Sequence, residues 1–260
     1  MFIIWSIGGC TSLRCFRKTG LLQRPVKIRN LSELSWREQW QGIVFNGDKV
    51  GFTRLKINPA VEAGLYNIAS ETYPSVRFMG IDKMIHLIGF ETVRPDLTLS
   101  SFHYELKMDA QPLWIDGDVR EGQLRAILTS ASKKRILQKP VNLVYPASTV
   151  NLYPLLKGLV VGDHYRYEVF DPHTQTLSEV EQTVEAFEQS HQLMIEPSFR
   201  IETVMLGQRA STWINLRREA IFELRLNGII IMYKEDESRA RSYLSETAWA
   251  RRTLSSTSAL

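Results

Sequence analysis

Two apolar-rich runs flank an Asn-Gly pair in the stretch Trp40-Gln-Gly-Ile-Val-Phe-Asn46-Gly47-Asp-Lys-Val-Gly51-Phe-Thr-Arg-Leu-Lys-Ile57. Asn and Gly both accept the positive φ angles that a tight two-residue turn requires. Apolar runs on both sides of such a pair are typical of two antiparallel strands. The stretch therefore predicts a β-hairpin.

The same reasoning identifies strands along the rest of the chain. Apolar and polar residues alternate over 102–108, which places one apolar face and one polar face on a half-buried strand. A second hairpin is predicted around Glu121-Gly122. Further strands are predicted over 165–170, 199–206, 212–216 and 220–226. Strands at this spacing predict a mainly β fold, either an antiparallel sandwich or an open or half barrel.

Three segments depart from the strand pattern. Residues 148–158 suit a short helix or a turn between strands. Residues 177–188 fit both helical spacing and strand alternation, and local propensity favours the helix. Residues 236–250 carry acidic residues first and basic residues later, which is the polarity that stabilises a helix. We therefore predict a C-terminal helix packed on the sheet through Ala240, Tyr243, Leu244 and Ala248.

The chain length allows one large domain or two small ones. It has 260 residues with 44% hydrophobic content, which excludes a disordered or collagen-like protein. No internal repeat or linker divides the strand-rich region. We assign residues 1–35 to an apolar N-terminal segment and basic linker, 36–250 to a single β-rich domain, and 251–260 to a flexible tail.

The basic charge belongs to the ends of the chain. The net charge is +4, residues 1–40 contribute +5 and Arg251 and Arg252 add two, so the span 41–250 carries −3. A nucleic-acid platform needs clustered basic residues with interleaved aromatics on the fold itself. We therefore exclude nucleic acid as a partner. The run Lys133-Lys134-Arg135 predicts a solvated turn, with an anionic headgroup or polymer as an alternative contact.

Both cysteines, Cys10 and Cys15, lie in the first 15 residues, so neither a disulfide nor a thiol nucleophile is available to the body. Ile7-Gly8-Gly9-Cys10 ends an apolar run and resembles the lipobox of bacterial lipoproteins, in which the cysteine is lipidated. The basic residues that open a secretory signal are missing before the run. Two readings stay open: lipidation at Cys10, with a start upstream of Met1, or an uncleaved apolar N-terminus that tethers the chain weakly to a membrane.

Several motifs together carry a resemblance to a known kind of domain. These are Trp40-x-Gly-Ile-x-x-Asn46-Gly47-x-Lys49-Val-Gly51-Phe52, Gly80, Phe170-Asp171-Pro172 and Thr212-Trp213-Ile214-Asn215. They resemble the β-rich domain found upstream of transglutaminase-like cores in bacterial envelope proteins, and related stand-alone periplasmic domains of unknown function. The resemblance implies that 177–188 is a strand, and that the protein resides in the bacterial periplasm or on a membrane that faces it.

The residues argue against an enzyme. Transglutaminase-like chemistry needs a cysteine, a histidine and an orienting carboxylate or amide, and the body holds no cysteine. The five histidines show no metal-ligand spacing, and Asp116-Gly117-Asp118 favours a strand turn over a metal loop. No phosphate loop or nucleophile elbow occurs. We expect no catalytic residue, no metal and no cofactor.

Two binding functions remain. The first is a non-enzymatic envelope domain that binds a protein, such as a transglutaminase-like or peptidase chain, with edge strands and Trp213 available for strand addition. The second is a carrier that holds a lipid or another apolar molecule inside a half barrel. The residues predicted to line that cavity are Phe78, Phe102, Tyr104, Leu106, Met108 and Trp114. The alternative reading is that these six form the ordinary core.

Overall fold

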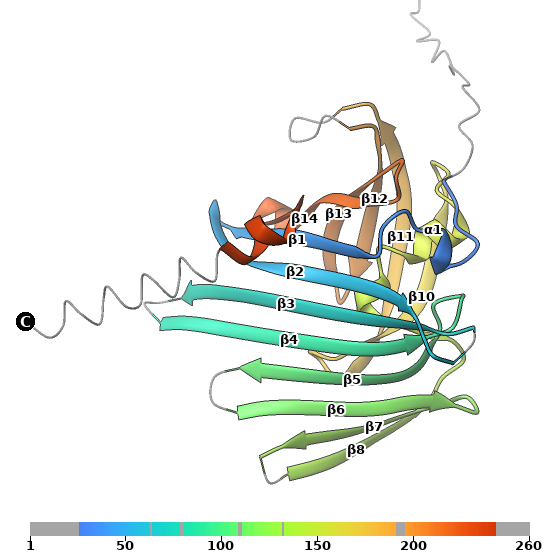
Figure 1. Cartoon of the computed structure of the whole chain (residues 1–260), viewed down its shortest axis with the longest axis vertical. Coiled ribbons are helices and arrows are strands. Elements are labelled where there is room, and N and C mark those ends of the chain that lie inside the picture. Colours follow the sequence, from blue (N-terminus) through green and yellow to red (C-terminus); the bar gives the residue numbers. More distant parts are fainter. Residues whose placement is uncertain are drawn as a thin grey trace, which may run out of the picture.

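One large curved β-sheet forms the fold (Figure 1). The computed structural model describes residues 26–62, 64–78, 81–108, 111–131, 133–190 and 196–242, with the side chains of 76–84 and 108–111 outside that description. The strands are β1 (Glu38–Phe45), β2 (Asp48–Pro59), β3 (Tyr66–Phe78), β4 (Ile81–Val93), β5 (Leu99–Met108), β6 (Gln111–Arg120), β7 (Gln123–Ser130), β8 (Lys133–Pro140), β9 (Val144–Pro146), β10 (His164–Asp171), β11 (Thr176–Glu188), β12 (Ser198–Met205), β13 (Gln208–Asn215), β14 (Ala220–Arg225) and β15 (Ile230–Glu235). The short helices are η1 (Leu31–Glu33), η2 (Ala147–Thr149), α1 (Tyr153–Lys157) and η3 (Leu226–Gly228).

The 15 strands follow the order β8-β7-β6-β5-β4-β3-β2-β1-β15-β14-β13-β12-β11-β10-β9. Every pairing is antiparallel except β9 with β10. Strands β8 and β9 occupy opposite edges although only residues 141–143 separate them in the chain, so the sheet must curl until its ends approach each other. It does not close, because β8 and β9 do not pair. The prediction of a mainly β, open-barrel fold is confirmed.

The core lies on the concave face of the sheet, where its two halves meet. Phe102 on β5 packs against Phe170 on β10, with ring centroids 4.8 Å apart. Tyr104 and Leu106 point to the same side and are buried, while His103 and Lys107 point to the convex side. This is the predicted alternation of β5, and the burial of large apolar side chains supplies about 1.5–3 kcal/mol each.

Residues 26–35 belong to the folded domain. Ile28 and Leu31 are fully buried in the main core, and the Ile28 amide donates to the Leu155 carbonyl at 2.9 Å. We predicted that the domain begins at residue 36, but in the described part of the chain it begins ten residues earlier, at residue 26. The segment lies near α1 (Figure 1), and its apolar side chains belong to the main core.

The C-terminal helix covers part of the convex face. Residues 237–242 are helical, and Ala240 is fully buried against Trp40 and Phe52. The Arg241 guanidinium lies 4.8 Å from the centre of the Trp40 ring. The predicted packing through Ala240 is confirmed, whereas Tyr243, Leu244 and Ala248 lie outside the described residues. Among the described residues, no helix has the length and apolar character needed to cross a lipid bilayer.

Several local predictions have clear outcomes. Both hairpins form, with φ of 50° at Asn46 and 50° at Glu121 in the two turns. Residues 177–188 are strand β11, as the family resemblance implied against local helix propensity. The predicted turn at 133–135 is wrong, because these residues open the edge strand β8. Strands β3, β4, β9 and β15 were not predicted.

Candidate ligand-binding cavity

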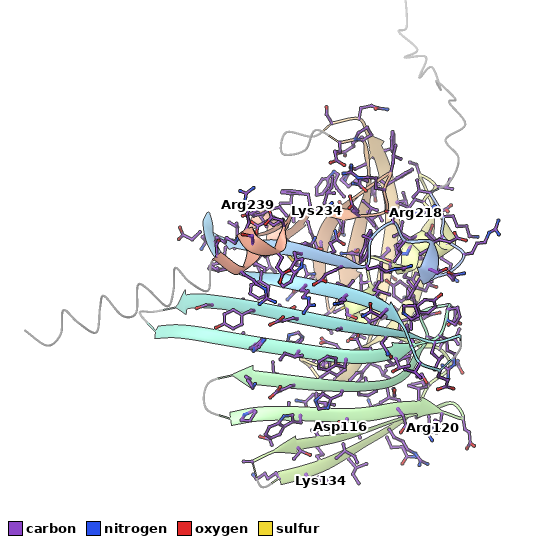
Figure 2. All side chains as sticks on the ribbon, viewed as in Figure 1. Asp116, Arg120, Lys134, Arg218, Lys234 and Arg239 are labelled. Atoms are coloured by element: carbon purple, nitrogen blue, oxygen red, sulfur yellow. The ribbon has the colours of Figure 1, made fainter. Side chains whose placement is uncertain are left out.

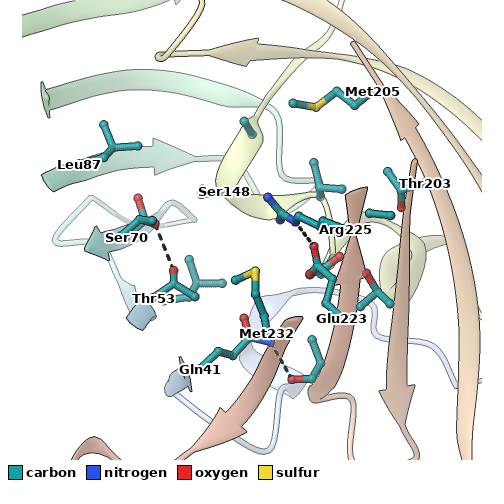
Figure 3. Close-up of a pocket in the computed structure, with 18 of the residues that line it drawn as sticks. Gln41, Thr53, Ser70, Leu87, Ser148, Thr203, Met205, Glu223, Arg225 and Met232 are labelled. Carbon is teal, nitrogen blue, oxygen red and sulfur yellow. Dashed lines mark hydrogen bonds and ion pairs between the residues drawn. The ribbon is translucent and has the colours of Figure 1, made fainter. Parts of the chain in front are cut away.

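A cavity of about 460 Å³ lies on the concave face of the sheet (Figure 3). Strands β1–β5 form one wall, β12–β15 form the other, and residues 147–152 form part of the lining between them. Polar side chains from both walls share the lining with apolar ones. The polar lining includes Gln39, Gln41, Thr53, Ser70, Thr72, Glu91, Tyr104, Ser148, Asn151, Thr203, Thr212 and Glu223, and the apolar lining includes Ile43, Leu87, Met205 and Met232.

Glu91 is a buried carboxyl group in the β4 wall, with 2% of its surface exposed. Its Oε1 accepts a hydrogen bond from the Tyr104 hydroxyl at 2.8 Å, and its Oε2 accepts one from Ser148 Oγ at 2.6 Å. Burial disfavours the charged form and raises the pKa of Glu91 to about 7, although the two hydroxyl donors lower it. Both protonation states are therefore populated near neutral pH.

Glu223 is the buried acid of the opposite wall, on β14. Its Oε1 forms an ion pair with Arg225, which Figure 3 shows as a dashed line, and its Oε2 accepts from Asn151 Nδ2 at 3.2 Å. The positive charge of Arg225 stands beside the carboxylate, so this buried charge is compensated within the chain.

The segment 147–151 connects the two walls, because Ser148 bonds to Glu91 and Asn151 bonds to Glu223. The Val150 carbonyl between them accepts from Gln182 Nε2 at 3.2 Å and from the Tyr167 hydroxyl at 3.3 Å. These bonds fix the segment on the inner face of β10 and β11. The predicted short helix over 148–158 is present here as η2 and α1.

Asp171 also lines the cavity, at the end of β10. Its Oδ1 accepts from the His173 amide at 2.9 Å and lies 3.3 Å from His173 Nδ1, and its Oδ2 accepts from Thr174. Burial alone raises the pKa of Asp171, but the hydrogen bonds from His173 and Thr174 outweigh it and the pKa is lowered. This bond to the amide two residues on is the turn chemistry expected of aspartate.

The six residues predicted to line a cavity separate into different environments. Tyr104 lines the cavity through its contact with Glu91, whereas Phe102 and Leu106 are packed in the core. Trp114 pairs across the strands with the outward-facing Glu105, so it lies on the convex face. The prediction that it lines the cavity is therefore wrong. The side chains of Phe78 and Met108, and the whole of Cys10, lie outside the described residues.

We predicted that Trp213 is available for strand addition, and this prediction is wrong. It lies within β13, between β12 and β14, and is 3% exposed. Its Nε1 donates to Glu188 Oε2 at 2.8 Å. The edge that is exposed along its length is β8.

The Asp-Gly-Asp run lies in the middle of β6 rather than in a turn, with Asp116 on the convex face and Gly117 facing the core. Asp116 Oδ1 accepts a hydrogen bond from His103 Nδ1 at 2.6 Å. Gly117 is required because a Cβ there would collide with the Phe102 ring. In the described ranges, His, Cys, Asp and Glu side chains form no group of three suited to a metal ion.

No protein-family description matches the sequence, and no curated protein shows significant similarity to it. A solved structure does share the fold: the crystal structure of a β-barrel-like protein of a domain of unknown function, DUF1849, from Brucella abortus. The similarity has a TM-score of 0.51 and 8% sequence identity, and it covers 76% of this chain and 94% of the other. At this identity the similarity concerns the fold alone.

Proposed function

We propose that this chain is a non-enzymatic binding protein that holds a small molecule in the cavity on its concave face. The observation that carries the proposal is the cavity of about 460 Å³ with buried polar groups on both walls. Ligand sites in proteins typically enclose about 300–1,000 Å³ and combine an apolar lining with a few fixed polar groups. The cavity has this size and this mixture.

The chemistry of the lining favours a ligand that is partly polar. Thr53 and Thr72 place hydroxyl groups 3.2 Å apart on the inner face, and Gln41 reaches the same space. A purely apolar lipid would displace water from these groups without replacing its hydrogen bonds, which costs free energy. Leu87 and Met232 give the ligand an apolar contact. We therefore favour an amphipathic molecule over the lipid that the sequence suggested.

Native mass spectrometry of the full chain, purified from cells without detergent, tests this function. We expect an added mass that disappears on denaturation. Ala210→Trp fills the cavity from β13 and should abolish the added mass, whereas Ile127→Trp adds the same ring on the convex face and should retain it. A bare mass for the unaltered chain, in extracts of its native host, would contradict the proposal.

The cellular compartment is also part of the proposal. We propose a periplasmic or envelope location, with attachment through lipidated Cys10, on the basis of the apolar segment that ends at this residue. Cys10→Ala should release the protein from the membrane fraction of bacterial cells, and Cys15→Ala serves as the control. Equal membrane association in all three proteins would exclude the lipid anchor.

A second candidate function rests on strand β8. Among the described strands, this edge strand pairs only with β7. It is exposed along its length and carries Lys133, Lys134 (labelled in Figure 2), Arg135 and Lys139. Exposed lysines on an edge discourage pairing with a second basic copy, and they favour an acidic extended segment that would add to the sheet. The partner would be an envelope protein, such as a transglutaminase-like or peptidase chain, that presents such a segment.

An alternating Glu-Val peptide and its Lys-Val counterpart test the edge directly. We expect the acidic peptide to bind and the basic one not to bind. Replacing both Lys133 and Lys134 with Glu should remove binding of the acidic peptide, whereas the same change at Lys56 and Lys107, on the convex face away from the edge, should not. Equal binding of the two peptides would contradict recognition by charge.

A further inference from the structure

Glu91 differs from the other buried acids in having no cationic partner. Asp171 lies beside His173 and Glu223 is ion-paired with Arg225, but the partners of Glu91 are the hydroxyl groups of Tyr104 and Ser148. Within the described ranges, no Lys, Arg or His nitrogen comes within ion-pairing distance of Glu91. A buried carboxylate without a counter-charge is costly, so its retention on a cavity wall calls for an explanation.

The geometry leaves Glu91 able to accept more hydrogen bonds. An ionised carboxylate has about four acceptor positions on its two oxygens. Tyr104 uses one position on Oε1, and Ser148 uses one on Oε2. Because Glu91 lines the cavity, a bound ligand can donate hydrogen bonds to the acceptor positions that remain.

We propose that the cavity recognises an organic cation, an alkylammonium or guanidinium compound, whose charged nitrogen donates to the Glu91 carboxylate. The inference rests on the proposed binding function and names its ligand class. Charge-assisted hydrogen bonds to a carboxylate are stronger than neutral ones and would compensate the buried charge. The apolar part of the ligand would lie against Leu87 and Met232.

Four arginines of the described chain also line the cavity. Arg225 is ion-paired with Glu223, Arg54 is ion-paired with Glu38, and Arg218 donates to the Glu33 carbonyl. Arg209 lies on β13, in the wall opposite Glu91. Tyr104 faces Glu91 from β5, and Asp171 and His173 lie at the end of β10. Because burial raises the pKa of Glu91 to about 7, a bound cation should favour the ionised form and binding should release protons near neutral pH.

Calorimetric titration of the full chain with two matched probes tests the proposal. Hexylammonium chloride and hexan-1-ol have the same alkyl chain and differ in the charged end. At pH 8 we expect the ammonium compound to bind about tenfold more tightly. At pH 5.5 this preference should fall by about tenfold, because protonated Glu91 carries no charge while the probe stays cationic. The pH comparison uses the unaltered protein and so does not depend on a variant folding.

Two variants assign the preference to a residue. Glu91→Gln keeps the shape of the side chain and should make the two probes bind equally at pH 8. Glu179→Gln removes an exposed carboxylate of β11 outside the cavity, and it should keep the preference. Cooperative unfolding of each variant in urea establishes that it is folded.

The outcomes separate this inference from the binding function. Equal affinity of the two probes for the unaltered chain at pH 8 would overturn the cationic ligand class while leaving the cavity as a binding site. A preference that persists in Glu91→Gln would overturn the role of Glu91. If neither probe binds, the cationic class is also overturned, and the native mass measurement alone decides whether the cavity holds a ligand.

Discussion

Ser148 Oγ lies 2.6 Å from Glu91 Oε2 and donates a hydrogen bond that joins residues 147–151 to strand β4. The two residues come from opposite halves of the sheet in strand order. Ser148 lies in η2, just after the edge strand β9, whereas Glu91 lies on β4, the fifth strand from the β8 edge. The bond therefore helps to hold the curled sheet together. It also places an ionisable group against the cavity, so the stability of the fold and the chemistry of the site depend on the same contact.

Ser148→Ala should destabilise the protein. It removes one of the two donors to a buried carboxyl group, and a hydrogen bond to a charged group contributes about 1.5–3 kcal/mol. We expect a loss of about 1–3 kcal/mol in the free energy of unfolding, measured with urea at pH 8. Ser101→Ala, at a half-buried position of β5, should change stability by less than about 0.5 kcal/mol. Equal effects of the two substitutions would show that the bond contributes little.

Glu91→Gln should change how stability depends on pH. The folded state raises the pKa of Glu91 from its ordinary value of 4.5 to about 7 through burial, so between these values the folded protein binds more protons than the unfolded chain. The free energy of unfolding therefore falls by up to about 3 kcal/mol as pH rises from 4.5 through about 7, and below pH 4.5 this loss is absent. The unaltered protein should lose stability relative to Glu91→Gln between pH 5 and pH 8.

Urea unfolding of both proteins at several pH values measures this difference. Glu179→Gln, which replaces a carboxyl group exposed on β11, serves as the control. It should leave the pH profile of the unaltered protein nearly unchanged. Parallel profiles for the unaltered protein and Glu91→Gln would mean that Glu91 does not hold a proton in the folded state.

Gly117→Ala should disturb the contact between β6 and β5. A Cβ at this position would collide with the Phe102 ring and with the Arg125 carbonyl oxygen, and the ring cannot withdraw because it packs on Phe170. Overpacking of this kind costs about 1–3 kcal/mol. Asp116→Ala, the neighbouring change on the exposed face, should cost less. The midpoints of thermal unfolding compare the two, and a Gly117→Ala protein with an unchanged midpoint would refute the clash.

The sequence predicts the parts of the fold that depend on local contacts. The turn at Asn46-Gly47 forms because both residues accept positive φ angles, and in the turn at Glu121-Gly122 the glycine accepts a φ of 69°. The structure of residues 176–188 is harder to predict, because local propensity favours a helix. The sheet creates the alternation in which Val180 and Val184 are buried and the positions between them are more exposed. The family resemblance, rather than the local pattern, gave the right answer for this segment.

The cavity cannot be predicted from local sequence patterns, for a physical reason. Strands β3 and β4 turn Ser70, Thr72, Gly89 and Glu91 toward the inside, so they lack the apolar alternation by which a strand is recognised. Their inward polar residues are the ones that line the cavity. Because Glu91 and Glu223 meet the segment 147–151 only after the sheet has curled, the sequence contains no spacing that links them.

Ala240→Asp should release the C-terminal helix while leaving the sheet folded. Ala240 is fully buried against Trp40 and Phe52, so a carboxylate there would be desolvated between two aromatic rings. We expect hydrogen exchange of the amides in 237–242 to accelerate strongly, while amides in β1 and β2 stay protected. Glu237→Ala, on the exposed side of the same helix, should leave the exchange within about threefold of the unaltered rate, because it removes a surface ion pair with Arg241 worth about 0.5 kcal/mol. If the amides of β1 lost protection from exchange together with those of the helix, the prediction would be wrong. The packing of Trp40 and Phe52 in the sheet would then depend on Ala240.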